Sequence, residues 1–218
     1  MDPLQIVVRG RARGSYPAER GTISLAANVE GSDRESVYRR ALDVHAPLCR
    51  DLTELADAGA VSRWNSDQLR VFSYRPSGSG GLRRLTYRVA VKVEAEFVDF
   101  EKMSLFLDRW AVAEGVEVGY THWDVTEENR LTYEAELRRH AVADATAKAQ
   151  AFSDAAGRGP VTAVQLADPG MLGLGQAEYG AARAMFASAP AGAGGPALEL
   201  RPDDIELDVR VDARFTAG

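Results

Sequence analysis

Three stretches of the chain alternate apolar and polar residues with a period of two, which predicts strands that bury one face. They are residues 22–29, 85–97 and 205–215. In the second, valines and aromatic residues take every other position, and arginine, lysine and glutamate fill most of the positions between them. One face of each strand is therefore expected in a core and the other in water, as in an antiparallel sheet with helices on one side.

Helical spacing of apolar residues predicts three helices. The first follows a capping box formed by Ser32 and Glu35 and runs for about 25 residues toward Gly59. Pro47 lies inside it, and its missing N–H predicts a kink or break near Ala46. The second helix is capped by Asp99 and ends at Gly115.

The third helix is expected over about 127–156. Its apolar seam is predicted to consist of Leu131, Ala135, Val142, Ala145, Ala149, Phe152 and Ala156.

The order of these elements predicts the fold class. The segments 20–75 and 84–126 both pass from alternating strand to capped helix, glycine and strand, which indicates the β-α-β-β-α-β order of ferredoxin-like folds. We therefore expect an α+β protein with a mainly antiparallel sheet, helices packed on one face, a βαβ-βαβ repeat, a long third helix and a C-terminal strand joining the sheet. Past Tyr120 the apolar parity changes, which predicts a β-bulge near Thr121 and His122.

The length and composition favour one domain spanning residues 1–218. Residues 169–197 are rich in Gly, Ala and Pro and show no period, so they are predicted to form a loop or arm without its own core. We call this segment the arm.

Several motifs of the chain resemble the SIMPL domain family. They are Val8-Arg9-Gly10-Arg11-Ala12 near the start, Gly59-Ala60-Val61 after the first helix, the strand Tyr87 to Val93, the run Ala141 to Ala149 with Asp144 and Lys148, and the C-terminal stretch from Arg183 to Leu207. The alanine-rich run is the most specific of these matches. The resemblance implies the fold above and a bacterial SIMPL protein of unknown function, and it supplies no catalytic residues. Many bacterial relatives begin with an export signal, which the N-terminus here does not show.

Charge and composition narrow the classes of function. The formal net charge of -6 argues against non-specific nucleic-acid binding, which needs a basic surface. No segment approaches the 18 or so apolar residues that span a membrane, and no signal peptide is visible, so a cytoplasmic location is expected. The single cysteine, Cys49, has no partner for an internal disulfide and is expected as a buried thiol in the first helix.

The candidate chemistry is sparse. The three histidines, His45, His122 and His140, lack the short spacings of zinc ligands. His122 and Asp124 form one polar cluster in which the carboxylate would orient the imidazole as a general base, although a surface or sheet-packing role is the simpler interpretation. The glycines of 170–175 lack the spacing and the lysine of a phosphate loop. We therefore expect no catalytic residue, no metal and no cofactor.

The favoured function is a non-enzymatic one, in protein interaction or self-assembly. A possible interaction arm carries Leu172, Leu174, Tyr179, Met185 and Phe186 in a segment too rich in Gly and Ala to bury them alone. These side chains are expected to dock either on the same domain or on a partner. The partner would be a second copy of the chain, which would give a homo-oligomer, or another protein. The alternative is a small-molecule-binding protein or hydrolase that uses a cleft near the sheet face and the 169–197 segment.

Overall fold

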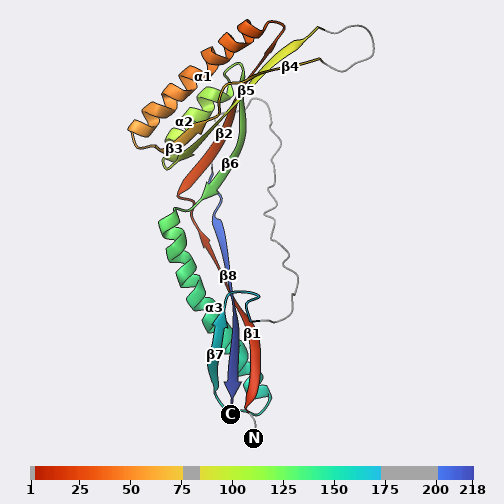
Figure 1. The fold of residues 1–218 in the computed structure, drawn as a ribbon. Helices are drawn as coiled ribbons and strands as arrows, with labels where there is room; N and C mark the ends of the chain where they lie inside the picture. Colours follow the sequence, from red (N-terminus) through yellow and green to blue (C-terminus); the bar gives the residue numbers. More distant parts are fainter. Residues whose placement is uncertain (1–2, 76–83, 173–200) are drawn as a thin grey trace. The chain divides into compact units, whose positions relative to one another are not determined.

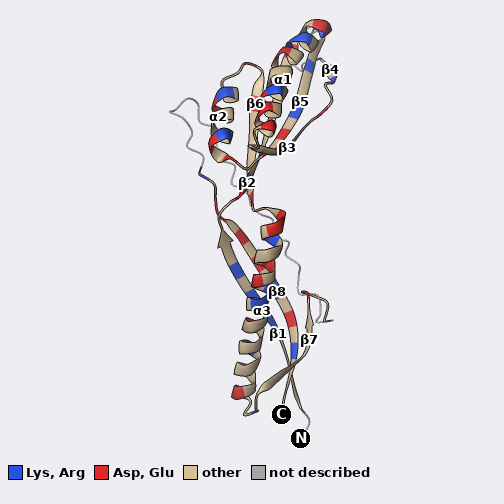
Figure 2. Cartoon of the chain, turned by 90° about the vertical axis from the view of Figure 1, so that its left-hand side faces the viewer, with Lys and Arg blue, Asp and Glu red and all other residues tan. Residues whose placement is uncertain are grey.

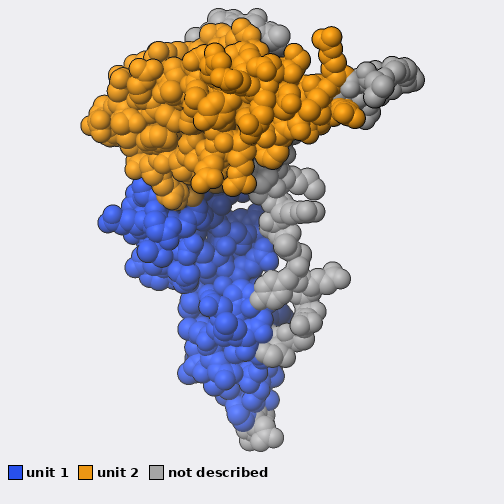
Figure 3. All heavy atoms as spheres, turned by 45° about the horizontal axis from the view of Figure 1, so that its top comes forward, with its two compact units in different colours: residues 1–17, 125–192, 204–218 blue, residues 18–124, 193–203 orange. Residues whose placement is uncertain are grey.

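The computed structural model describes residues 3–75, 84–172 and 201–218. These residues form two compact units (Figure 3): unit 1 holds 3–17, 125–172 and 204–218, and unit 2 holds 18–75, 84–124 and 201–203. The α+β class with antiparallel sheets is confirmed. The expectation of one domain over 1–218 stays a prediction.

The elements follow one another along the chain as labelled in Figure 1. They are β1 (Leu4–Tyr16), β2 (Arg20–Gly31), α1 (Arg34–Asp57), β3 (Val61–Ser66), β4 (Val71–Tyr74), β5 (Thr86–Phe97), α2 (Phe100–Ala111), β6 (Val116–Asp124), α3 (Glu127–Ala155), β7 (Val161–Ala167) and β8 (Ile205–Ala217). The alternating stretches 22–29, 85–97 and 205–215 correspond to β2, β5 and β8, as predicted.

Unit 2 has the predicted β-α-β-β-α-β order if β3 and β4, which pair with successive parts of β5, are counted as one interrupted strand. Its strands lie in the order β3-β5-β2-β6, with β4 also paired to β5, and all of these pairings are antiparallel. The two central strands, β2 and β5, pair from Gly21 with Phe97 to Gly31 with Tyr87. Because β2 and β3 both pair with β5, the α1 connection crosses over one strand, as in ferredoxin-like folds.

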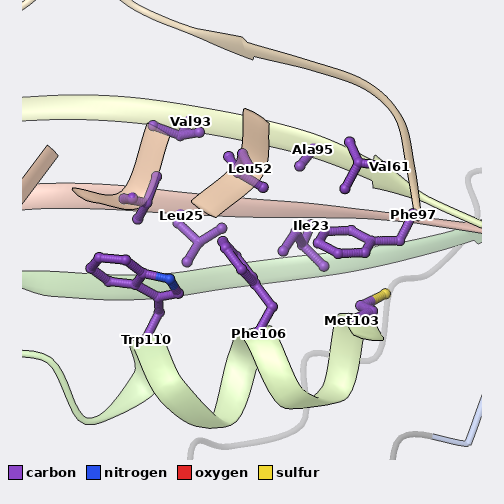
Figure 4. Packing of buried hydrophobic residues seen from close by; sticks show 11 residues of the cluster. Ile23, Leu25, Leu52, Val61, Val93, Ala95, Phe97, Met103, Phe106 and Trp110 are labelled. Carbon is purple, nitrogen blue, oxygen red and sulfur yellow. The ribbon is translucent and has the colours of Figure 1, made fainter. Parts of the chain in front are cut away.

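The core of unit 2 lies between the sheet and helices α1 and α2. Figure 4 shows Phe106 and Trp110 of α2 pointing toward Ile23 and Leu25 of β2, which are almost fully buried. Fully burying side chains of this size stabilises the fold by roughly 1.5–3 kcal/mol each before entropy is counted. The alternation of apolar and polar residues in β2 and β5 therefore places their apolar side chains against the helices, and the burial of these side chains holds the strands there.

Helix α1 differs from its prediction in two details. It runs through Pro47 without a break. Its N-cap is Asp33, whose carboxylate accepts a hydrogen bond of 2.8 Å from the backbone N–H of Ser36, and not Ser32. Both residue types cap helices well, so the sequence located the helix start to within one residue. The predicted cap of α2, Asp99, is confirmed by its 3.0 Å bond from the N–H of Lys102.

The bulge in β6 lies slightly earlier than predicted. The register with β2 shifts between Ile23 and Leu25, which pair with Thr121 and Val118, so Gly119 and Tyr120 share the space opposite one β2 residue. The parity change past Tyr120 is thereby explained.

Unit 1 is built on a three-stranded sheet in the order β1-β8-β7. The C-terminal strand therefore joins a sheet of its own with β1 and β7, and not the sheet of β2 and β5 as expected. β1 pairs with β8 over its whole length, from Leu4 with Ala217 to Tyr16 with Ile205. Figure 1 shows α3 running along this sheet.

The seam of α3 agrees with the prediction only in part: Ala145 and Ala149 are buried as predicted, whereas Ala135 and Ala156 are exposed. Its buried residues are four apart along the helix, namely Leu137, Ala141, Ala145, Ala149 and Ser153. Leu131 and Phe152, which were expected on the seam, are exposed. Most of these buried side chains are small, and Leu137 is the large apolar residue among them.

Candidate interaction surface

Helix α3 lies unusually close to β1 because Gly10 has no side chain. A Cβ placed at Gly10 would overlap the backbone carbonyl oxygen of Ala141 and lie 2.8 Å from Cβ of Ala145. Any other residue at position 10 would push the helix away from the strand, since the obstacle is backbone. Gly10, from the first family motif, and Ala141 and Ala145, from the alanine-rich motif, are thus the two sides of one contact.

The same helix blocks the outer edge of β1. The carboxylate of Asp144 accepts a 2.8 Å hydrogen bond from the backbone N–H of Arg11, and Nζ of Lys148 donates to the carbonyl oxygen of Arg9 at 3.1 Å. Asp144 and Lys148 also form an i,i+4 ion pair of 2.6 Å. Side chains on outward backbone groups prevent a further strand from pairing there. Sequence analysis noted both residues in a motif but did not assign them this role.

The opposite edge of the sheet, β7, has no such cover among the described residues. β7 is the end strand, and its five central residues are exposed, with Val164 and Leu166 exposed by 55% and 53%. Figure 2 draws β7 in tan, whereas β1 and β8 carry blue and red segments. Gln150 of α3 reaches the start of this strand, where its Oε1 accepts a 3.0 Å hydrogen bond from the N–H of Val161.

Charge is the usual protection of an edge strand, and β7 has none. Its sequence is Val-Thr-Ala-Val-Gln-Leu-Ala, without a charged residue or a proline. The bulge between Ala163 and Gln165, where Val164 has no partner on β8, is a local irregularity of this strand. An exposed, uncharged edge is a template for pairing with another strand.

A buried carboxylate fixes the turn that leads from β7 into the arm. Asp212 of β8 is fully buried and accepts two hydrogen bonds from the Arg9 guanidinium, at 2.6 and 3.0 Å. It also accepts a 2.8 Å bond from the N–H of Gly170. The hydrogen bonds from Arg9, together with the bond from Gly170, hold the pKa of Asp212 below its usual value. Burial acts in the opposite direction but does not cancel their effect.

The arm itself lies almost entirely outside the described residues. Leu172 is described and is half-buried. Leu174, Tyr179, Met185 and Phe186 lie outside, so their docking stays a prediction.

The His122 and Asp124 cluster is placed on β6. His122 pairs across the sheet with Thr22, and its side chain is exposed. The carboxylate of Asp124 accepts a 2.9 Å hydrogen bond from Arg20. The same Arg20 guanidinium also reaches the buried Glu96 at 3.4 Å, and the role of His122 and Asp124 stays a prediction.

The open face of the unit 2 sheet carries the groups that the alternative function would use. Shallow hollows of about 220 and 460 Å³ lie over it. Around them, Glu94 holds Lys92 at 2.5 Å and the Tyr120 hydroxyl at 3.1 Å, and Asn28 donates to Glu117. These side chains bind one another, but Oδ1 of Asn28, in the lining of the larger hollow, is buried without a hydrogen-bond partner.

One cluster was missed by the sequence analysis. Cys49 Sγ lies 3.3 Å from Nε2 of His45, and Ser66 Oγ lies 2.7 Å from the same nitrogen. Burial lowers the pKa of His45 and raises that of Cys49. The signal was the i,i+4 spacing of a histidine and a cysteine on one helix, which places both on one side.

Two further findings concern the described residues. They contain no group of three or more His, Cys, Asp or Glu side chains placed to hold a metal ion. None of their helices has the length and hydropathy to cross a membrane.

The fold and this surface define an α+β protein with two antiparallel sheets, one of which has a blocked edge and an open one. The sequence profile of SIMPL, described as a protein of unknown function (DUF541), matches residues 6–215. The chain belongs to this family. No curated protein matches it.

Proposed function

We propose that the chain acts as a non-enzymatic interaction protein that associates with further copies of itself by strand pairing at β7. The observation that carries the proposal is the difference between the two edges of one sheet. The β1 edge is closed by Asp144 and Lys148, and the β7 edge is exposed and uncharged.

Self-pairing is favoured over an unrelated partner by the chemistry of β7. A strand without charge gains most from a partner that also lacks charge, because no ionised group must be desolvated. A second β7 meets this condition in an antiparallel arrangement, in which each strand supplies the other's missing backbone hydrogen bonds. The two copies of Val164 and Leu166 would then lose part of their exposure to water.

Light scattering of the purified chain over a range of concentrations tests the proposal. We expect the wild type to assemble as concentration rises, and Val164→Lys to remain monomeric because lysine is an effective edge blocker. Val112→Lys is the matched control, since Val112 is 86% exposed at the C-cap of α2 and belongs to no strand. A monomeric wild type, or Val164→Lys that assembles as the wild type does, would refute the proposal.

A deletion of residues 173–200 separates the edge from the arm. If β7 is the contact, the deletion variant still assembles and Val164→Lys in the deletion background does not. If the deletion alone abolishes assembly, the arm and not the edge makes the contact.

A further inference from the structure

The open face of the unit 2 sheet is hollowed at its centre, where two alanines form the floor. Ala26 of β2 lies between Lys92 of β5 and Glu117 of β6, and Asn28 of β2 lies opposite Ala90 of β5. These residues line the hollow of about 460 Å³. A volume of this size is within the range of small-ligand sites.

The charges in the lining of the hollow do not cancel. Nζ of Lys92 lies 2.5 Å from Oε1 of Glu94, so a carboxylate already balances this ammonium group. Glu117 accepts its hydrogen bond from Asn28, which is neutral, and Asp67 has no donor to its carboxylate among the described residues. Two carboxylates of the lining are therefore left without a cation in the part of the chain that the structure describes.

The amide of Asn28 has a defined orientation and an unused acceptor. Its Nδ2 donates to Glu117, and an ionised carboxylate can only accept, so this bond fixes which end of the amide faces Glu117. Oδ1 then lies at the other end, where it is buried without a hydrogen-bond partner. A buried acceptor without a donor is uncommon in folded proteins and indicates a donor from outside the described residues.

We propose that the hollow binds a linear diamine, with one ammonium group on Glu117 and Asn28 and the other on Asp67. An ammonium group has three donors and no acceptor, and it therefore matches two carboxylates and an amide oxygen, which can only accept. Oδ1 of Asn28 is covered in the free chain, and a rotation about the Cβ–Cγ bond, which is a soft torsion, brings it to the ligand.

The positions of the two carboxylates favour a diamine over a metal ion. The N–H of Asp67 donates to the carbonyl oxygen of Lys92 at 2.9 Å, so Asp67 continues the β3 side of the sheet, whereas Glu117 lies on β6. The two backbones are three strand spacings apart, or roughly 14 Å. A metal ion needs all its oxygen ligands within about 2.6 Å, whereas a chain of methylene groups over Ala26 can join two separate charges.

Titration of the full chain with 1,4-diaminobutane, followed by ¹⁵N–¹H NMR against sodium chloride at the same ionic strength, tests the proposal. We expect saturable shifts of the Asn28 side-chain amide and of the backbone amides of Ala26 and Ala90. 1-Aminobutane should bind roughly 1.5–5-fold more weakly, because it lacks one exposed ion pair. Absence of saturable shifts at these residues, or equal binding of the two amines, overturns the proposal.

Three substitutions locate the binding. Glu117→Gln keeps an acceptor for Asn28 but removes the charge, and should weaken the binding of both amines. Asp67→Asn should reduce the affinity for the diamine to that for 1-aminobutane. Glu114→Gln is the matched control, since Glu114 has a side chain that is 94% exposed and lies outside the lining, and it should bind as the wild type does.

The outcomes of these variants decide between a site and general charge attraction. Wild-type affinity in Glu117→Gln, or a diamine preference retained in Asp67→Asn, contradicts the assigned roles. An equal loss in Glu114→Gln and Glu117→Gln would mean that the amines respond only to net charge. The hollow lies on a different sheet from β7, so these results are independent of strand pairing.

Discussion

Replacing Gly10 with alanine tests how α3 is held against β1. The added Cβ would overlap the carbonyl oxygen of Ala141 and lie 2.8 Å from Cβ of Ala145. A side chain in a tight contact can rotate away, but a helix carbonyl cannot, so the whole of α3 or β1 must shift. Overpacking of this kind costs typically 1–3 kcal/mol, and the backbone obstacle places Gly10→Ala at the upper end of that range.

Two opposing effects determine how much stability Gly10→Ala is expected to lose. Alanine restricts the unfolded chain more than glycine does, which alone would stabilise the fold by about 0.4–1 kcal/mol. The net loss for Gly10→Ala is therefore about 2 kcal/mol in the free energy of unfolding, which corresponds to roughly 4–8 °C in Tm for a chain of this length. Urea unfolding followed by circular dichroism measures it.

The control for Gly10→Ala is Gly159→Ala, where the same atom would meet only the terminal carbonyl of Gly218 at 3.4 Å. Its stability should equal or slightly exceed that of the wild type. Adding Ala145→Gly to Gly10→Ala removes the 2.8 Å contact but leaves the clash with Ala141 and puts a glycine in the interior of α3, so no rescue is expected. Wild-type stability of Gly10→Ala would refute the close contact between α3 and β1.

Three further substitutions test other parts of the structure. Asp212→Asn should lower the free energy of unfolding by about 2 kcal/mol at pH 7, because it weakens the charge-assisted bonds from Arg9. Since the pKa of Asp212 is lowered in the folded state, its contribution to the free energy of unfolding is present above about pH 4 and is lost as pH falls through the lowered pKa. Below about pH 4 the Tm of the wild type should therefore fall more steeply with decreasing pH than that of Asp212→Asn. Equal slopes for the two proteins would contradict this. Asp144→Ala should uncover the β1 edge and increase the mass measured by light scattering, and a mass no greater than that of the wild type argues against edge blocking. Leu52→Ala, at a fully buried position, should cost about 2–5 kcal/mol in urea unfolding, against almost nothing for Leu105→Ala, which is 58% exposed; similar losses would mean that the core is misplaced.

The sequence predicted those features that depend on local pattern. The alternation in 22–29 and 85–97 identified β2 and β5, because a strand with one buried face must alternate whatever its neighbours are. The order of strands and helices then sufficed for the ferredoxin-like arrangement of unit 2.

Features that depend on contacts between residues far apart in the sequence could not be predicted from local pattern. β8 pairs with β1 across almost the whole length of the chain, and its alternation is the same whichever sheet it joins. Leu131 and Phe152 were wrongly placed on the seam of α3 because apolar side chains were expected there, whereas the contact with β1 is made where Gly10 admits alanines. That information is shared between two segments and is absent from the helix alone.

The candidate surfaces, too, could be predicted from the sequence only in part. The absence of charge in Val161–Ala167 is visible in the sequence, but its position at the end of a sheet is not. The i,i+4 pair of His45 and Cys49 was also visible, whereas Ser66, whose Oγ lies 2.7 Å from Nε2 of His45, comes from a different element.

Hydrogen exchange measured at low and high protein concentration tests the central claim most directly. If chains pair through β7, the amides of 162–167 become more protected as concentration rises, and those on the outer edge of β1, including Arg11, keep their protection at all concentrations. Exchange in 162–167 that is independent of concentration, or protection that increases on β1 instead, would contradict the account.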